Sequence, residues 1–241
     1  MLIKTRAIVL HSIKFGESQY IVDMFVEETG RVAFIQKVLP SGRGKIRKQL
    51  FQPLSLLDIE FDLRPKVRLQ RLKEARLLVP YATIPFDPYK LSLTIFVAEF
   101  LLHVTRNEQQ NKPLFEYVAA SLQWLDGCER SFSNFHLVFM MRLSLFVGFF
   151  PNLDKAGDGV FFDFRAGCFV RQQPLHPDFL PPADAARLRV LMRMTFDNMH
   201  LFAMSRVERN LCVDFILKYY RLHFPDFPEM KSLDVIKSLF A

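Results

Sequence analysis

The side chains with the clearest chemical potential are the cations of one short stretch, Gly30 to Lys48. No Asp or Glu lies between Glu28 and Asp58. The cations of the stretch are Arg31, Lys37, Arg43, Lys45, Arg47 and Lys48. An alternating strand pattern leads into a Pro-Ser-Gly-Arg-Gly segment, so we expect a basic arm displayed at a sheet edge. Such a row of cations suits the backbone of a polyanion.

A second basic run follows on a predicted strand. Its cations are Arg64, Lys66, Arg68, Arg71, Lys73 and Arg76, and they face only Glu74. Because alternate residues of a strand share a face, we predict that Arg68, rather than Arg71, joins the arm in one groove. The alternative is that each of these cations is an ordinary outward position of a half-buried strand.

Aromatic side chains lie near these cations in the sequence, namely Phe15, Tyr20, Phe34 and Phe51. Surfaces that bind single strands combine backbone-tracking charge with base stacking. We favour Tyr20 as the stacking residue. Phe34 stands between Ala33 and Ile35 in a strand that must also supply core, and we expect it to be buried.

The positive charge of the chain is confined to its first third. Residues 1–80 hold 15 Lys and Arg against 8 Asp and Glu, and residues 81–241 hold 17 against 17, so the net charge of +7 belongs to the first part. A confined positive field indicates an anionic partner, with nucleic acid first and an acidic membrane surface second. An ordinary solvated basic surface is the alternative.

Motifs of common enzymes and cofactor sites are missing from the sequence. The segment from Gly42 to Lys45 lacks the earlier Gly of a phosphate-binding loop, and Ile46 follows where Ser or Thr is needed. The Asp residues between 154 and 163 miss the spacing of a calcium loop. No grouping of His, Cys or Ser residues indicates nucleophilic catalysis. We therefore expect no enzyme activity and no cofactor.

The three cysteines are far apart in the sequence and build no disulfide framework, which fits a reducing compartment. The N-terminus does not resemble a signal peptide. The longest apolar runs fall short of the roughly 20 residues of a membrane span. We expect a cytoplasmic protein without a membrane anchor.

The periodicity changes near Pro80, which predicts two domains in an α+β chain. Residues 1–80 are expected to form a five-stranded OB-type β-barrel, and residues 81–241 a helical domain. The expected strands are Thr5–His11, Tyr20–Glu27, Arg31–Val38, Ser55–Phe61 and Val67–Leu78. The expected helices are 89–105, 113–126, 134–149, 182–200 and 206–223, the third buried all round and the last opened by a capping box at Ser205. A small hairpin lies between the third and fourth helices.

Several motifs, taken in order, resemble the RecO family of bacterial recombination mediators. They are Ala7-Ile8-Val9-Leu10, Gly16-Glu17-Ser18, Ile21-Val22, Phe25, Gly30-Arg31, Gln52-Pro53-Leu54, Phe139-x-x-Arg142-Leu143, Gly148-Phe149-x-Pro151-x-Leu153, Lys231-Ser232 and Leu239. The resemblance implies an N-terminal OB barrel and a C-terminal helical domain. It also implies binding of single- and double-stranded DNA, strand annealing, and help to RecA, together with RecR, on DNA coated by single-stranded DNA-binding protein. The helical domain would contact the acidic tail of that coating protein.

One departure from the family concerns a metal site. Many members carry a four-cysteine zinc site after the central helix, and its positions would fall near Ala156, Gly159, Arg171 and Pro174, none of which is cysteine. Cys168 alone cannot hold a tetrahedral zinc ion. We predict a zinc-less hairpin over residues 156–174, packed instead by Phe161, Phe162, Phe164 and Phe169.

The predicted function is therefore that of a non-enzymatic, DNA-binding recombination mediator in DNA repair. The predicted DNA contacts are Arg31, Lys37, Arg43, Lys45, Arg47, Lys48 and Arg68. Arg142 is the lone cation of an apolar helix; it would meet the partner's acidic tail or, as we favour, pair with an internal acid. The rival functions are a metal-dependent nuclease and a peripheral membrane protein.

Overall fold

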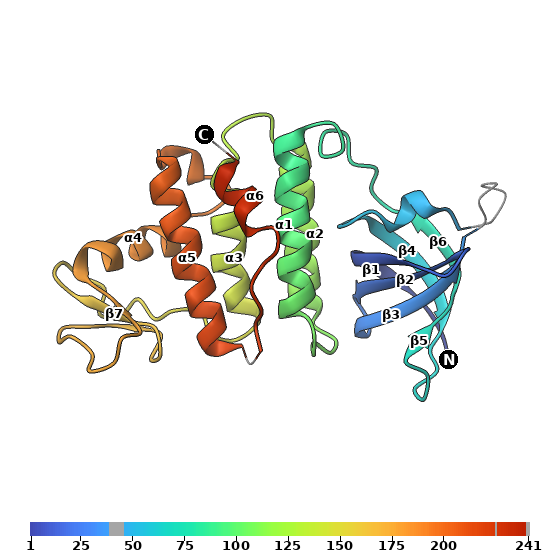
Figure 1. Ribbon diagram of the computed structural model, residues 1–241, viewed down its shortest axis with the longest axis horizontal. Coiled ribbons are helices and arrows are strands. Elements are labelled where there is room, and N and C mark those ends of the chain that lie inside the picture. The colour runs from blue at the N-terminus through green and yellow to red at the C-terminus, as the bar shows by residue number, and fades with distance from the viewer. Residues whose placement is uncertain (39–45, 225, 240–241) are drawn as a thin grey trace. The chain divides into compact units, whose positions relative to one another are not determined.

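A computed structural model describes residues 1–38, 46–224 and 226–239 (Figure 1). The chain divides into two compact units. The first unit comprises Met1–Gly127 with Met230–Ile236, and the second comprises Cys128–Glu229 with Lys237–Ala241. The predicted change from strands to helices near residue 80 therefore falls inside the first unit.

The described part of the first unit contains a sheet of six strands in the order β5-β3-β2-β1-β4-β6. Their bounds are β1 Leu2–Phe15, β2 Gln19–Val26, β3 Gly30–Lys37, β4 Leu56–Asp62, β5 Leu69–Gln70 and β6 Leu72–Leu77. All neighbouring pairs are antiparallel except β3 and β5. The predicted α+β class is confirmed.

The predicted five-stranded closed barrel needs correction. Arg71 divides the predicted fifth strand into β5, which pairs with β3, and β6, which pairs with β4. These two short strands are the opposite edges of the sheet, so the sheet curls until its edges approach each other. No strand pairing among the described residues joins the edges, and the sheet is open.

The inner face of the sheet holds the core of the first unit. Val22, Phe34 and Phe61 have no exposed surface, and the rings of Phe34 and Phe61 meet edge to face at 5.1 Å. The expectation that Phe34 is a core residue is confirmed. β1 carries a bulge at Leu10, where its register against β2 shifts.

Two helices of the first unit pack on the sheet. They are α1 Pro88–Val104 and α2 Lys112–Gly127. The carboxylate of Asp87 accepts hydrogen bonds from the N–H groups of Tyr89 and Lys90, which caps α1 as expected for an Asp-Pro start. The loop between the helices approaches Gly30 so closely that a Cβ there would lie 2.4 Å from backbone atoms of Gln109. Only glycine fits at this position.

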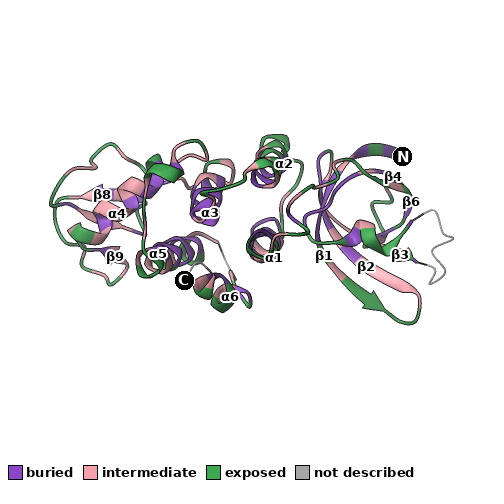
Figure 2. Cartoon of the chain, turned by 90° about the horizontal axis from the view of Figure 1, so that it is seen from above, coloured by how far each residue is buried: buried purple, intermediate pink, exposed green. Residues whose placement is uncertain are grey.

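The second unit is built on α3 Phe135–Phe146, α4 Pro182–Arg193 and α5 Arg206–His223. Most of α3 is buried, which confirms the predicted central helix (Figure 2). The predicted capping box at Ser205 is present, with Glu208 as its partner. The predicted fourth helix ends at Arg193 rather than His200, because Met194 is extended; a short 3-10 turn, η2 Met199–Leu201, follows it.

A small sheet and a short last helix lie in the C-terminal part of the chain. The strands β7 Phe161–Asp163, β8 Cys168–Val170 and β9 Phe179–Leu180 form the sheet, of which β7 and β8 are the predicted hairpin. The short helix α6, Leu233–Ser238, was not predicted. None of the described helices is long and apolar enough to cross a bilayer.

Candidate nucleic-acid interface

The end of the β1–β2 hairpin brings cations beside an aromatic ring. Lys14 on β1 pairs in register with Tyr20 on β2, and Tyr20 pairs with Gln36 on β3, so the three side chains share one face. The ammonium of Lys48 lies 5.7 Å from the centre of the Tyr20 ring. Lys48 opens the 3-10 helix η1, Lys48–Phe51, which is anchored where the Ser12 hydroxyl donates to the Phe51 carbonyl at 2.9 Å.

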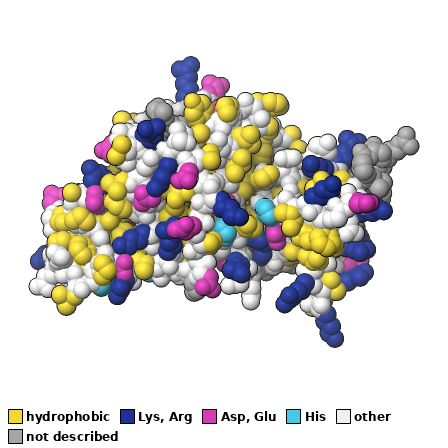
Figure 3. Space-filling model, viewed as in Figure 1, with side chains coloured by type: hydrophobic (Ala, Val, Ile, Leu, Met, Phe, Trp, Pro, Cys, Tyr) yellow, Lys and Arg dark blue, Asp and Glu magenta, His cyan; other side chains and the backbone are white. Residues whose placement is uncertain are grey.

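The opposite face of the same hairpin end is apolar. Ile13, Ile21 and Ile35 lie side by side across β1, β2 and β3, and the next row places Phe15 beside Gln19 and Lys37. Ile13 is 45% exposed and Phe15 is 52% exposed. The surface over the strands accordingly combines an apolar patch with surrounding Lys and Arg side chains (Figure 3). Unstacked bases need such apolar surface next to cations for their phosphates.

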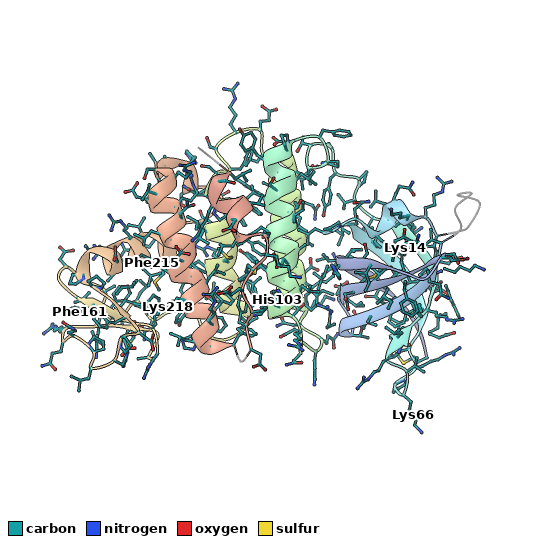
Figure 4. The ribbon with its side chains drawn as sticks, viewed as in Figure 1. Lys14, Lys66, His103, Phe161, Phe215 and Lys218 are labelled. Atoms are coloured by element: carbon teal, nitrogen blue, oxygen red, sulfur yellow. The ribbon has the colours of Figure 1, made fainter. Side chains whose placement is uncertain are left out.

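A second group of cations lies in the segment between β4 and β5. Arg64, Lys66 and Arg68 are exposed there, and Arg71 is exposed at the junction of β5 and β6. Two hollows of about 480 Å³ each flank β5. One is bordered by Ile35 and Arg71, the other by Arg68. Lys66 lies well apart from Lys14 along the sheet (Figure 4).

Acidic neighbours divide the cations of the first unit into two sets. Several are paired: Lys4 with Glu60 at 2.9 Å, Lys73 with Asp62 at 2.9 Å, Arg76 with Asp58 at 2.5 Å, and Arg6 with Glu27 and Glu116. Within the described residues of positions 1–80, eight others have no carboxylate within salt-bridge distance. These unpaired cations are Lys14, Lys37, Arg47, Lys48, Arg64, Lys66, Arg68 and Arg71.

Arg31 is held inside the first unit instead of facing solvent. Its guanidinium lies 3.1 Å from the Asp23 carboxylate and donates to the Leu102 carbonyl at 3.3 Å and to the Thr105 hydroxyl at 3.4 Å. Its side chain is 16% exposed. Burial lowers the pKa of Arg31 from its ordinary value, against the opposing effect of Asp23. This geometry gives Arg31 a structural task.

The other predicted contacts fall into two groups. Lys37, Arg47, Lys48 and Arg68 are exposed and unpaired. Lys37 and Lys48 lie at the hairpin end, Arg47 precedes Lys48 in the chain, and Arg68 lies in the segment before β5. Arg43 and Lys45 lie outside the described residues. Sequence reasoning did not select Lys14, Arg64, Lys66 or Arg71; for the last three the basic run itself was the available indication.

Arg142 in the second unit is half-buried on α3. Its Nε donates to the backbone carbonyl of Met194 at 3.0 Å. Among the described residues no carboxylate pairs with it, so the favoured internal acid is replaced by a peptide oxygen at the end of α4.

The hairpin of the second unit is packed by aromatic rings, as predicted. Phe162, Phe164 and Phe169 are buried. The centre of the Phe162 ring lies 5.5 Å from that of Phe164 and 5.0 Å from that of Phe169. Phe161 is half-buried against Phe179 at 5.7 Å. In the part of the chain that the structure describes, no three His, Cys, Asp or Glu side chains are grouped to hold a metal ion.

Comparison with known proteins covers both parts of the chain. The family model "Recombination protein O N terminal" matches residues 1–81, and "Recombination protein O C terminal" matches residues 85–233. The chain is 50% identical to the DNA repair protein RecO of Phocaeicola vulgatus and 48% identical to that of Bacteroides fragilis, in both cases over 241 residues and the full length of both chains. It is 36% identical to the RecO of Porphyromonas gingivalis, again over both full lengths. The chain therefore belongs to the RecO family of DNA repair and recombination proteins.

Proposed function

We propose that this chain binds the sugar-phosphate backbone of single- and double-stranded DNA through the unpaired cations of its first unit. The observation that carries the proposal is the position of Lys14, Lys37 and Lys48 beside exposed apolar and aromatic side chains at the hairpin end. A cation that is already paired with a carboxylate gains little binding free energy from a phosphate, because it must first give up its partner. When an unpaired cation binds a phosphate, only the counterions of the DNA are displaced.

From this binding we infer a non-enzymatic mediator role. Two strands held on one cationic surface repel each other less, which favours annealing of complementary strands. In the recombination setting of the family, the proposed partners are RecR, single-stranded DNA-binding protein and, indirectly, RecA. The chain would help RecA to replace the coating protein on single strands.

The proposed contact with the coating protein's acidic tail involves Arg142. Only its Nε is bonded to Met194 among the described residues, so the terminal nitrogens of the guanidinium are available for a carboxylate. Arg142→Glu should abolish binding of a tail peptide if this contact exists. Unchanged peptide binding by a folded Arg142→Glu variant would assign Arg142 to the support of α4 alone.

Fluorescence anisotropy with a labelled single strand, over a range of salt concentrations, tests the binding proposal. If about six phosphates are neutralised, log K should fall against log salt with a slope of roughly −4. Annealing of complementary strands should be faster with the protein, also when the strands are coated. Magnesium-dependent cleavage of the DNA by the pure protein would instead support a nuclease.

A further inference from the structure

The segment between β4 and β5 carries three cations at alternate positions. Arg64, Lys66 and Arg68 are all exposed, and no carboxylate of the described residues pairs with them. The nearest acid in the sequence, Asp62, already pairs with Lys73 at 2.9 Å. We call these three residues the loop cations.

The buried side chain of Gln70 fixes the backbone that displays the loop cations. Its Oε1 accepts from the Arg64 N–H at 3.0 Å, and its Nε2 donates to the carbonyls of Arg64 at 3.0 Å and of Val67 at 2.6 Å. Gln70 is 5% exposed. The Val67 N–H also donates to the Arg64 carbonyl at 3.0 Å, which closes a turn. The oxygen and the nitrogen of the Gln70 side-chain amide are thus both hydrogen-bonded to the backbone of this segment.

A backbone fixed in this way loses little freedom when a ligand binds, because the ordering has already occurred on folding. The hollows on either side of β5 add apolar walls, with Val67, Leu69 and Ile35 on one side and Val67 and Ala33 on the other. Cations at alternate positions beside apolar hollows suit a ligand chain in which negative charges alternate with flat apolar groups, since the cations can bind the charges and the hollows can take the flat groups. A single strand of nucleic acid has this chemistry.

We propose that residues 64–70 form a preorganised clamp for consecutive phosphates of a single strand, with the loop cations as ligands and Gln70 as the positioning residue. Lys66 of the clamp lies well apart from Lys14 of the hairpin end, so the clamp is a second contact site on the same unit (Figure 4). This inference rests on the proposed DNA-binding function.

The test uses the full chain and a labelled oligothymidylate in salt titrations. Arg64→Ala, Lys66→Ala and Arg68→Ala together should weaken binding about tenfold or more, and should reduce the magnitude of the salt slope by roughly 2, since each single-strand phosphate contact contributes about 0.7. Arg76→Ala is a matched control, because Arg76 is exposed but paired with Asp58. It should leave the slope unchanged.

Gln70→Met keeps the size of the side chain and all three charges but removes the hydrogen bonds. It should weaken binding several-fold in the wild-type background and should have no further effect in the triple variant. This non-additivity separates positioning from simple destabilisation. An equal additional loss in the triple variant would overturn the role of Gln70.

A third variant keeps the clamp and the proposed function separately testable. Lys14→Ala, Lys37→Ala and Lys48→Ala remove the hairpin-end charges. If this variant loses affinity and the loop variant does not, the clamp is wrong while DNA binding stands. A flat salt dependence of the wild type would instead overturn DNA binding itself. Loop variants that lose binding to anionic phosphatidylserine vesicles, but keep DNA binding, would make the loop a membrane site and overturn the clamp.

Discussion

Arg31 and Lys37 lie on the same face of β3, six residues apart, and have different surroundings. The Arg31 guanidinium is shared between Asp23, Leu102 and Thr105, whereas the Lys37 side chain is exposed at the end of the strand. Two cations of one strand can therefore have unrelated tasks. The proximity of an acceptor decides which task each one has.

Replacing these two residues separately should show the difference. Arg31→Gln removes buried hydrogen bonds and an ion pair, so it should lower the free energy of unfolding by about 1–3 kcal/mol. It should leave the salt slope of DNA binding unchanged. Lys37→Gln should change the unfolding free energy by less than about 0.5 kcal/mol and reduce the slope by about 0.7.

Urea unfolding and salt titrations measure both quantities. An Arg31→Gln protein of normal stability with a reduced slope would mean that Arg31 contacts phosphate after all, and the distinction between paired and unpaired cations would fail at this position.

Sequence patterns predicted part of this interface at the residue level. Lys37, Arg47, Lys48 and Arg68 were selected and are exposed. Lys14 was missed because the bulge at Leu10 breaks the alternation of β1, so the strand was expected to stop at His11. The surroundings of Arg31 include residues more than seventy positions away, which no local pattern contains.

At the level of elements, the hairpin of β7 and β8 is packed by an aromatic core. Phe162 has no exposed surface and touches both Phe164 and Phe169. Phe162→Ala should therefore lower the unfolding free energy by about 3–5 kcal/mol. Phe161→Ala should cost less, because Phe161 is only half-buried.

The same core predicts that metal removal has no effect. Elemental analysis of the purified protein should find no stoichiometric zinc, and a chelator should leave the melting temperature unchanged. Zinc at one equivalent, with a melting temperature that falls on chelation, would contradict this account of the hairpin.

The helix α6 depends on one carboxylate of α1. The Glu99 side chain accepts from the N–H groups of Lys231 at 2.7 Å and Ser232 at 2.8 Å and from the Ser232 hydroxyl. Burial alone would raise the pKa of Glu99, but these hydrogen bonds outweigh it and hold the pKa below its ordinary value. The folded protein therefore binds fewer protons at Glu99 than the unfolded chain does.

It follows that this stabilisation is complete above the ordinary carboxyl pKa of about 4.3 and is lost as the pH falls through the lowered value. Glu99→Gln should speed amide exchange of residues 230–236 at neutral pH. Glu229→Gln, at an exposed neighbouring position, is the control. Equal exchange in all three proteins would show that Glu99 does not hold the segment.

Local patterns predicted the elements with capping residues and missed those that depend on distant partners. The capping signals at Asp87 and Ser205 each lie within four consecutive residues, and the helices that they predict, α1 and α5, begin where expected. The division into β5 and β6 follows from pairing with β3 and β4, and α6 is too short to show a period. Neither could be predicted from its own residues.

At the scale of the whole molecule, the net charge of +7 belongs to the first 80 residues. There, acids bind some of the cations, and the unpaired cations supply the field that a polyanion would meet. Which cations are unpaired therefore matters as much for DNA binding as how many cations there are.

Two variants with the same change in net charge test this claim most directly. One replaces the unpaired cations Lys37, Arg47 and Lys48 by Ala, and the other replaces the paired cations Lys4, Lys73 and Arg76. On single-stranded DNA the first should reduce the magnitude of the salt slope by roughly 2, and the second should leave the slope at the wild-type value. Equal reductions in both variants, or no reduction in the first, would contradict the account.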